Sequence, residues 1–103
     1  MIIVLFEVTL KTGKLSHYLK WVEKLTQDLY QIKGFVSVQR FQHLSESNQL
    51  LSLSVWENEI AIKAWREHAH HVMAQEIGRA EIFERYSIRI AMVTRAYDFS
   101  AES

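Results

Sequence analysis

Residues 54–77 read SVWENEIAIKAWREHAHHVMAQEI, and this stretch decides the fold because it joins a strand to a strongly patterned helix. An alternating apolar run ends at Trp56, Asn58 can cap a helix, and apolar residues then recur at three- and four-residue steps. The pattern predicts one amphipathic helix from about Glu59 to Ile77. Two of the three tryptophans and three of the five histidines fall in the stretch, so a functional site is sought here first.

The elements on both sides complete a recognisable order. Apolar periodicity predicts strands at 2–10, 35–44, 49–56 and 85–97. It also predicts a first helix, whose apolar stripe runs from Leu15 to Ile32. Thr12 or Ser16 could cap the start of this helix, and Gly34 could end it. The order β-α-β-β-α-β is that of a ferredoxin-like split sandwich. We therefore expect an α+β fold, with a four-stranded antiparallel sheet and two helices on one face.

The second face of this sheet also carries apolar side chains. Ile3 and Leu5 alternate with the main apolar set of the first strand, so both faces of that strand are partly apolar. A large exposed apolar patch is rare on a monomer. We expect a homodimer in which the sheets pack together, formed from a single domain over residues 1–103 with a loose tail at 98–103.

Composition excludes several classes of function. Lysine plus arginine equals aspartate plus glutamate at 12 each, which gives no global charge for binding nucleic acid or an anionic membrane. No cysteine is present, which removes thiolate catalysis, disulfides and cysteine-based metal sites. The apolar start MIIVLFEVTL is too short to span a bilayer and lacks the flanks of a signal peptide, so we expect a cytoplasmic protein.

A continuous helix from Glu59 would place Trp65 and Val72 near the centre of its apolar face, with His68 on the inner half. Ala61 is a small residue beside the large Trp65 ring. Such a pair indicates either close helix–sheet packing or a pocket, and packing is the commoner use because interiors contain few voids. Trp65 itself can be a core residue or the wall of a binding site.

The histidines of the run HAHH differ in what they can do. His68 and His71 have the spacing for shared metal coordination, but His70 points away on the helical wheel and no carboxylate clearly completes a set. We therefore expect no metal site. His68 alone is either a general base, with an ordinary pKa of ~6.5 that suits a phenol, or a half-buried histidine bonded to the backbone.

The Trp56-Glu57 strand end, the helix containing Trp65, Arg66 and His68, and the arginine-alternating strand YSIRIAMVTRAY resemble the antibiotic biosynthesis monooxygenase family. The resemblance covers almost the whole chain. It implies a dimeric α+β barrel with a pocket between the helices and the sheet. Members of this family include cofactor-independent quinone-forming oxygenases, haem-degrading enzymes, small-molecule isomerases and signal-processing proteins.

Three positions depart from what the resemblance implies. The haem-degrading members carry an asparagine and a histidine where this chain has Phe6 and Gln75, so haem is not expected as a cofactor. The quinone-forming members carry an asparagine one turn before the tryptophan, where this chain has Ala61. Those enzymes also use an arginine on the last strand, a position that either Arg85 or Arg89 could occupy, although both could instead face a dimer seam.

The resulting expectation is a small cofactor-independent monooxygenase that oxidises an aromatic or quinol-type molecule with O2. Its catalytic residues would be His68 as base, Trp65 as wall, and Arg85 or Arg89 as charge stabiliser. The substrate pocket would be lined by Trp65, Ala61, Val72 and Phe6. The alternative is a non-catalytic protein that binds a small ligand, or haem, in the same pocket.

Overall fold

The computed structural model describes residues 1–101, apart from the side chain of Ala69, so residues 102–103 of the expected tail lie outside the described part. Its elements are β1 (Ile2–Leu10), α1 (Leu15–Leu29), β2 (Phe35–Gln42), β3 (Gln49–Trp56), α2 (Glu59–Arg66), α3 (Ala69–Ile77), the π-helical turn η1 (Gly78–Ile82) and β4 (Phe83–Met92).

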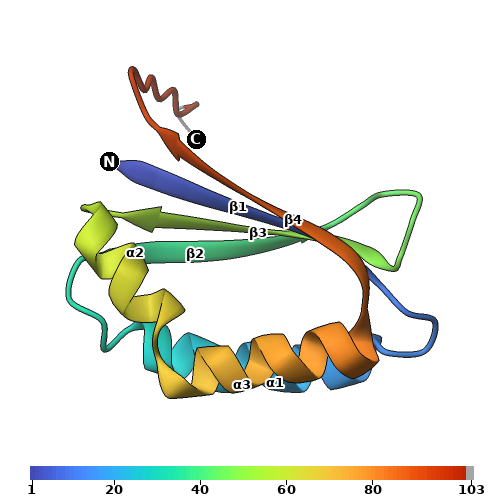
Figure 1. Cartoon of the computed structure of the whole chain (residues 1–103). Coiled ribbons are helices and arrows are strands. Elements are labelled where there is room, and N and C mark those ends of the chain that lie inside the picture. Colours follow the sequence, from blue (N-terminus) through green and yellow to red (C-terminus); the bar gives the residue numbers. More distant parts are fainter. Residues whose placement is uncertain (102–103) are drawn as a thin grey trace.

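The four strands form one antiparallel sheet in the order β2-β3-β1-β4. All the helical segments lie on one side of it, with α1 and α3 running side by side beneath the strands (Figure 1). The ferredoxin-like α+β architecture predicted from the order of elements is confirmed. The sheet therefore has an inner face, which meets the helices, and an outer face, which meets none of the described helices.

Strand β3 uses its two faces in an unusual way. Its inner face presents Ser52 and Ser54, paired across the sheet with Phe6 and Val4 of β1. Its outer face presents only apolar side chains between the strand ends, namely Leu51, Leu53 and Val55. Over residues 51–55 small polar side chains thus face the helices, while large apolar side chains face outward. This is the reverse of a sheet with one solvated face.

The buried core consists of two clusters rather than one. One cluster gathers Val8, Leu10, Tyr18 and Ile82. The other gathers Leu29, Trp56, Ala61 and Ile62. Trp56 is the largest side chain in either cluster and is 1% exposed; its Nε1 donates to Ser54 Oγ at 2.8 Å, which satisfies the indole inside the core. The space between the clusters is not filled, as described below.

The expected single helix over 59–77 is wrong, because the chain breaks between α2 and α3. His68 adopts an extended conformation with φ −63° and ψ 132°, and its own Nδ1 accepts from the His70 amide at 3.3 Å. This side-chain cap satisfies an amide at the start of a new helix. Asn58 caps α2 as expected, accepting from the Ala61 amide at 2.9 Å.

Several expected boundaries also shift. Helix α1 starts after Lys14 without a side-chain cap, so neither Thr12 nor Ser16 serves, and it ends at Leu29 where three-residue turns tighten the chain. Gly34 is needed for another reason: it has φ +95°, and a Cβ there would lie 2.7 Å from the Cβ of Ala61. The last strand ends at Met92 and not at residue 97, since only Val93 continues with a bond to Met1.

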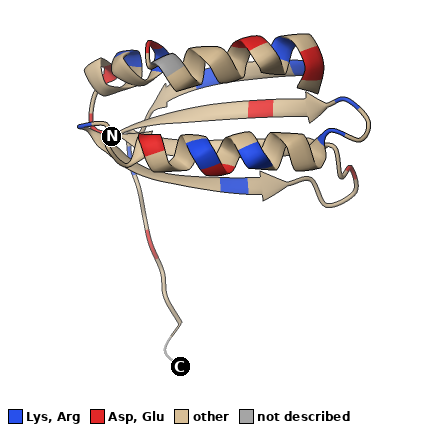
Figure 2. Ribbon diagram, turned by 90° about the horizontal axis from the view of Figure 1, so that it is seen from below, with Lys and Arg blue, Asp and Glu red and all other residues tan. Residues whose placement is uncertain are grey.

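Basic and acidic residues are interspersed along the helices, and neither kind is confined to one helix (Figure 2). This distribution agrees with the balanced numbers of basic and acidic residues in the sequence. No helix among residues 1–101 is both long enough and apolar enough to cross a membrane.

Gly78 follows α3 without ending the helical segment, because the chain continues through it into η1. A Cβ at this position would lie 2.6 and 2.9 Å from the Cζ and Cδ2 atoms of Phe83. Helix propensity alone favours alanine by about 1 kcal/mol, whereas overpacking a rigid ring costs about 1–3 kcal/mol and exceeds that gain.

We predict that Gly78→Ala lowers the free energy of unfolding by up to roughly 2 kcal/mol, the balance of these two effects. Urea denaturation measures the change. The exposed neighbour Arg79 supplies the control, since Arg79→Ala should alter stability by less than about 0.5 kcal/mol. A stabilised Gly78→Ala protein would contradict the close contact with Phe83.

Candidate functional site

A cavity of about 390 Å³ lies between the helices and the inner sheet face, within the size range of small-molecule sites. Both buried clusters contribute to its wall, so it occupies the gap between them. The two inner serines of β3 leave this space because they are too small to reach the helices. The lining is mostly apolar and comes from Val4, Phe6, Tyr18, Trp21, Val22, Leu25, Leu29, Val38, Arg40, Ser52, Ser54, Ile62, Trp65, Arg66, His71, Ala74, Gln75, Ile82, Phe83, Ile88 and Ile90.

Trp65 and His71 form the helical wall of this cavity. Their rings stack with centroids 4.9 Å apart and an interplanar angle of 29°. The break at His68 makes this contact, because α3 starts with a new orientation and returns His71 to the last turn of α2. The His68 ring also lies against Trp65, at 5.5 Å, but does not line the cavity.

His71 is held in its neutral form. Burial lowers the pKa of its imidazole, the backbone carbonyl of Arg66 opposes this, and His68 lowers the pKa further when it is protonated. Its Nδ1 is buried and has no hydrogen-bond partner among the described residues. The His71 side chain forms part of the cavity wall, and a neutral imidazole in such a position can accept a proton from a bound molecule.

Arg40 and Tyr18 form a polar group inside the cavity. Arg40 follows Val38 on the inner face of β2 and lies opposite Ser52 in the sheet register. Burial lowers the pKa of the Arg40 guanidinium, although its interactions with the phenols of Tyr18 and Tyr30 oppose that effect. Burial likewise raises the pKa of Tyr18, so its phenol is neutral at pH 7.

Two of the residues expected to bind substrate line the cavity, namely Trp65 and Phe6. Ala61 does not: it is 2% exposed and packs where Gly34 approaches, which favours the packing interpretation of this small residue. Val72 does not line it either, being 41% exposed because the helix break rotates it away from the sheet.

The last-strand arginines lie on the outer sheet face. Arg89 Nη1 donates to Glu7 Oε1 at 3.0 Å and to Ser87 Oγ at 3.3 Å. Arg85 borders a separate shallow hollow on the outer face. Neither lines the main cavity, because the two-residue period of β4 turns Ile88 and Ile90 inward in their place.

Sequence reasoning missed Arg40, Tyr18 and the cavity-facing role of His71. A signal existed for Arg40, since it alternates with Val38 along β2 and must share its face. Tyr18 carried the signal of a hydroxyl within an apolar helical stripe. His71 had none, because its placement depends on a break that the helical pattern concealed.

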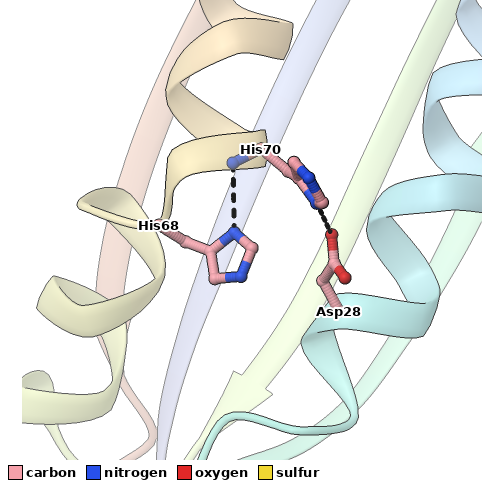
Figure 3. A group of neighbouring side chains, drawn as sticks. All are labelled: Asp28, His68 and His70. Carbon is pink, nitrogen blue, oxygen red and sulfur yellow. Dashed lines mark hydrogen bonds and ion pairs between the residues drawn. The ribbon is translucent and has the colours of Figure 1, made fainter.

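Three residues of metal-binding types lie close together between α1 and the start of α3. Asp28, His68 and His70 place donor atoms within 4.8 Å of one another, so within the described chain these residues could hold a metal ion. The expectation that His70 points into water is wrong: its Nδ1 bonds Asp28 Oδ2 of α1 at 2.8 Å (Figure 3). The Nδ1 atom of His68 is already used as the helix cap, so its neutral ring carries its proton on Nε2 and offers a metal no free nitrogen. The His70–Asp28 pair of this group therefore connects α3 to α1.

Comparison with known proteins places the chain among known sequences and folds. Residues 1–77 match the family model described as antibiotic biosynthesis monooxygenase. The chain is 37% identical over 94 residues to a Pyricularia oryzae protein named jasmonate monooxygenase ABM, covering 91% of this chain and 44% of that protein. It is 34% identical over 62 residues to the uncharacterized protein YqjZ of Bacillus subtilis, covering 60% of this chain and 53% of YqjZ. The chain thus spans about half the length of these curated relatives.

Solved structures share the fold at low sequence identity. A candidate antibiotic biosynthesis monooxygenase from Deinococcus radiodurans superposes with a TM-score of 0.86 at 15% identity, covering 98% of this chain and all of that one. Rv0793 from Mycobacterium tuberculosis gives a TM-score of 0.84 at 9% identity, covering 94% and 98%. At these identities the likeness establishes the fold.

The lowered pKa of His71 makes folding stability depend on pH. The unfolded chain binds a proton at this residue near pH ~6.5, whereas the folded chain binds it only at lower pH. The stability is therefore fully present above pH ~6.5 and is lost as the pH falls through the folded pKa.

We predict that the loss of unfolding free energy between pH 7 and pH 5 is smaller in His71→Gln than in the unmodified protein. Urea denaturation at the two pH values measures this. An NMR titration of the His71 ring checks the cause, with the same residue in the urea-unfolded chain as the reference. A folded pKa equal to or above the unfolded one would contradict the burial of this imidazole.

Proposed function

Because the chain belongs to the antibiotic biosynthesis monooxygenase family, we propose that it is a small monooxygenase that oxidises an aromatic or quinol-type molecule with O2, without a resident cofactor. The observation that carries the proposal is the cavity of about 390 Å³, whose wall combines the Trp65 ring with the neutral His71 imidazole. The monooxygenase name of the Pyricularia oryzae relative supports the same class of reaction.

In the proposed reaction the base is His71, and not His68 as the sequence suggested. His68 uses its Nδ1 to cap α3 and does not line the cavity. His71 lines the cavity, and its Nδ1 has no hydrogen-bond partner within the described part of the chain. Trp65 supplies a flat surface for an aromatic substrate, since offset-stacked rings attract one another.

The proposed chemistry balances for a substrate whose methylene group is flanked by aromatic rings, as in an anthrone. His71 accepts a proton from the methylene carbon, and the electron pair of the broken C–H bond remains on that carbon. This carbanion adds to O2 and takes the proton back from the imidazolium, which gives a hydroperoxide. Loss of water then breaks the O–O bond and leaves a carbonyl. One methylene group and one molecule of O2 therefore yield one carbonyl group and one molecule of water.

Oxygen consumption with a panel of hydroquinones and anthrones tests this function. We predict that His71→Gln lowers kcat by roughly 100-fold or more, as expected for loss of a general base, with a much smaller change in KM. His17 provides the matched control, because it lies on α1 and is not part of the cavity wall, so His17→Gln should retain full activity.

Two outcomes would contradict the proposed reaction. If no member of the panel raises O2 consumption above the buffer rate while ligands still raise the thermal midpoint, the cavity belongs to a binding protein. If turnover occurs and His71→Gln keeps the rate of the unmodified protein, the base is a different group. Hemin addition, followed by its Soret band, separates a haem-binding function from both.

We also propose that the protein is a homodimer joined through the outer sheet faces. Leu5 and Leu53 are cross-strand neighbours at the middle of that face, and Ile3 and Val55 form the next pair. Burying such a patch against a second copy stabilises the assembly through the hydrophobic effect. The Glu7–Arg89 pair lies on the same face and would give the seam a polar edge.

Light scattering coupled to size-exclusion chromatography measures the assembly. We predict a mass of twice 12.1 kDa for the unmodified protein, and a shift toward one chain for Leu53→Lys because a lysine cannot be buried there without a partner. Ile60→Lys is the control, since Ile60 is 80% exposed on α2. A single-chain mass for the unmodified protein across a range of concentrations would exclude this dimer.

A further inference from the structure

Arg40 is a permanent positive charge in the wall of an apolar cavity. Its neighbours on the inner face are Val38 on its own strand and Ser52 across the register. The guanidinium keeps its proton at any ordinary pH, so it cannot escape the cost of burial by becoming neutral. Arg40 is half-buried, and the part of its guanidinium that is removed from water normally requires a paired group of opposite sign.

The described residues supply no such partner for Arg40. The ion pairs among residues 1–101 join His70 to Asp28 and Arg89 to Glu7. The groups that interact with Arg40 are the phenols of Tyr18 and Tyr30, and burial keeps Tyr18 neutral at pH 7. Its Nε is buried and has no hydrogen-bond partner within the described chain.

The rest of the cavity wall indicates what could complete the site. Most of the lining is aromatic or aliphatic, and no aspartate or glutamate contributes to it among the described residues. An apolar molecule fits such a wall, and a carboxylate or phenolate on that molecule matches the planar donors of an arginine. Tyr18 stands beside Arg40 as a hydroxyl that can donate to the same oxygen.

We infer that the cavity selects small apolar molecules carrying one anionic group, a carboxylate or an acidic phenol, and that Arg40 is the specificity-determining residue that binds this group. The inference deepens the proposed function, because it assigns the substrate class of the same cavity. It concerns binding alone and holds whether or not the bound molecule is oxidised.

A matched pair of probes tests the inference: 2-naphthoate, and 2-naphthalenemethanol as its uncharged counterpart. Isothermal titration calorimetry under nitrogen measures both affinities without turnover. We expect the unmodified protein to bind the carboxylate roughly 10- to 100-fold more tightly than the alcohol, the range expected for hydrogen bonds to a charged group. Arg40→Met should abolish this preference while changing the affinity for the alcohol less than about threefold, because methionine retains an apolar wall.

Two further variants make the result specific to this charge. Arg40→Lys keeps the charge without the planar fork, so it should retain part of the preference. Arg89→Gln removes an arginine from the outer face and should leave both affinities unchanged. Replacing a buried charge by methionine is often tolerated, and circular dichroism of the variants confirms that they fold.

The inference is overturned if the unmodified protein binds the alcohol as tightly as the carboxylate, if it binds neither, or if Arg40→Met keeps the preference. Oxygen consumption is measured separately on the same samples. Charge selectivity without oxygen consumption would reject the proposed monooxygenase and retain the anion site. Oxygen consumption without charge selectivity would reject the anion site and retain the proposed monooxygenase.

Discussion

The imidazole of His68 accepts a hydrogen bond from the His70 amide at 3.3 Å, and the helical wall of the cavity depends on the turn that this bond closes. A continuous helix would send His70 into water and Val72 toward the sheet. After the turn, His70 reaches Asp28 on α1 and His71 stacks on Trp65. One side-chain cap therefore fixes both the path of α3 and the placement of the group proposed as the base.

The cavity lowers the stability of the fold through lost packing contacts, because protein interiors normally fill space at the density of organic crystals. Here the buried residues form two clusters, and the mostly apolar wall between them includes two serines, a guanidinium and the His71 imidazole, whose buried Nδ1 has no hydrogen-bond partner among the described residues. Each of these features lowers the stability of the free protein. Proteins retain such features where function requires them, and a bound molecule that fills the space and pairs with Arg40 would offset them.

Strand β3 links the cavity to the outer face of the sheet. Its two-residue period turns Ser52 and Ser54 toward the helices, and the same period turns Leu51, Leu53 and Val55 outward. A change of one residue in register would exchange the two sets, filling the cavity with leucine and covering the outer face with serine. The open interior and the apolar outer face are thus two consequences of one alternating sequence.

Local sequence patterns were enough to predict the sheet, the order of elements and the cap at Asn58, because period-two and period-3.6 patterns act locally. They left Trp65 open between a core residue and the wall of a site, and the structure places it at the cavity wall. Only the tertiary structure decided that the helix breaks at His68, that Arg40 and not Arg85 or Arg89 faces the cavity, and that Ala61 makes room for Gly34. The physical reason is that these three outcomes depend on contacts between distant segments. A periodic pattern assigns a face to a side chain, but which faces meet across the interior, and with what space between them, is fixed only when the helices pack on the sheet.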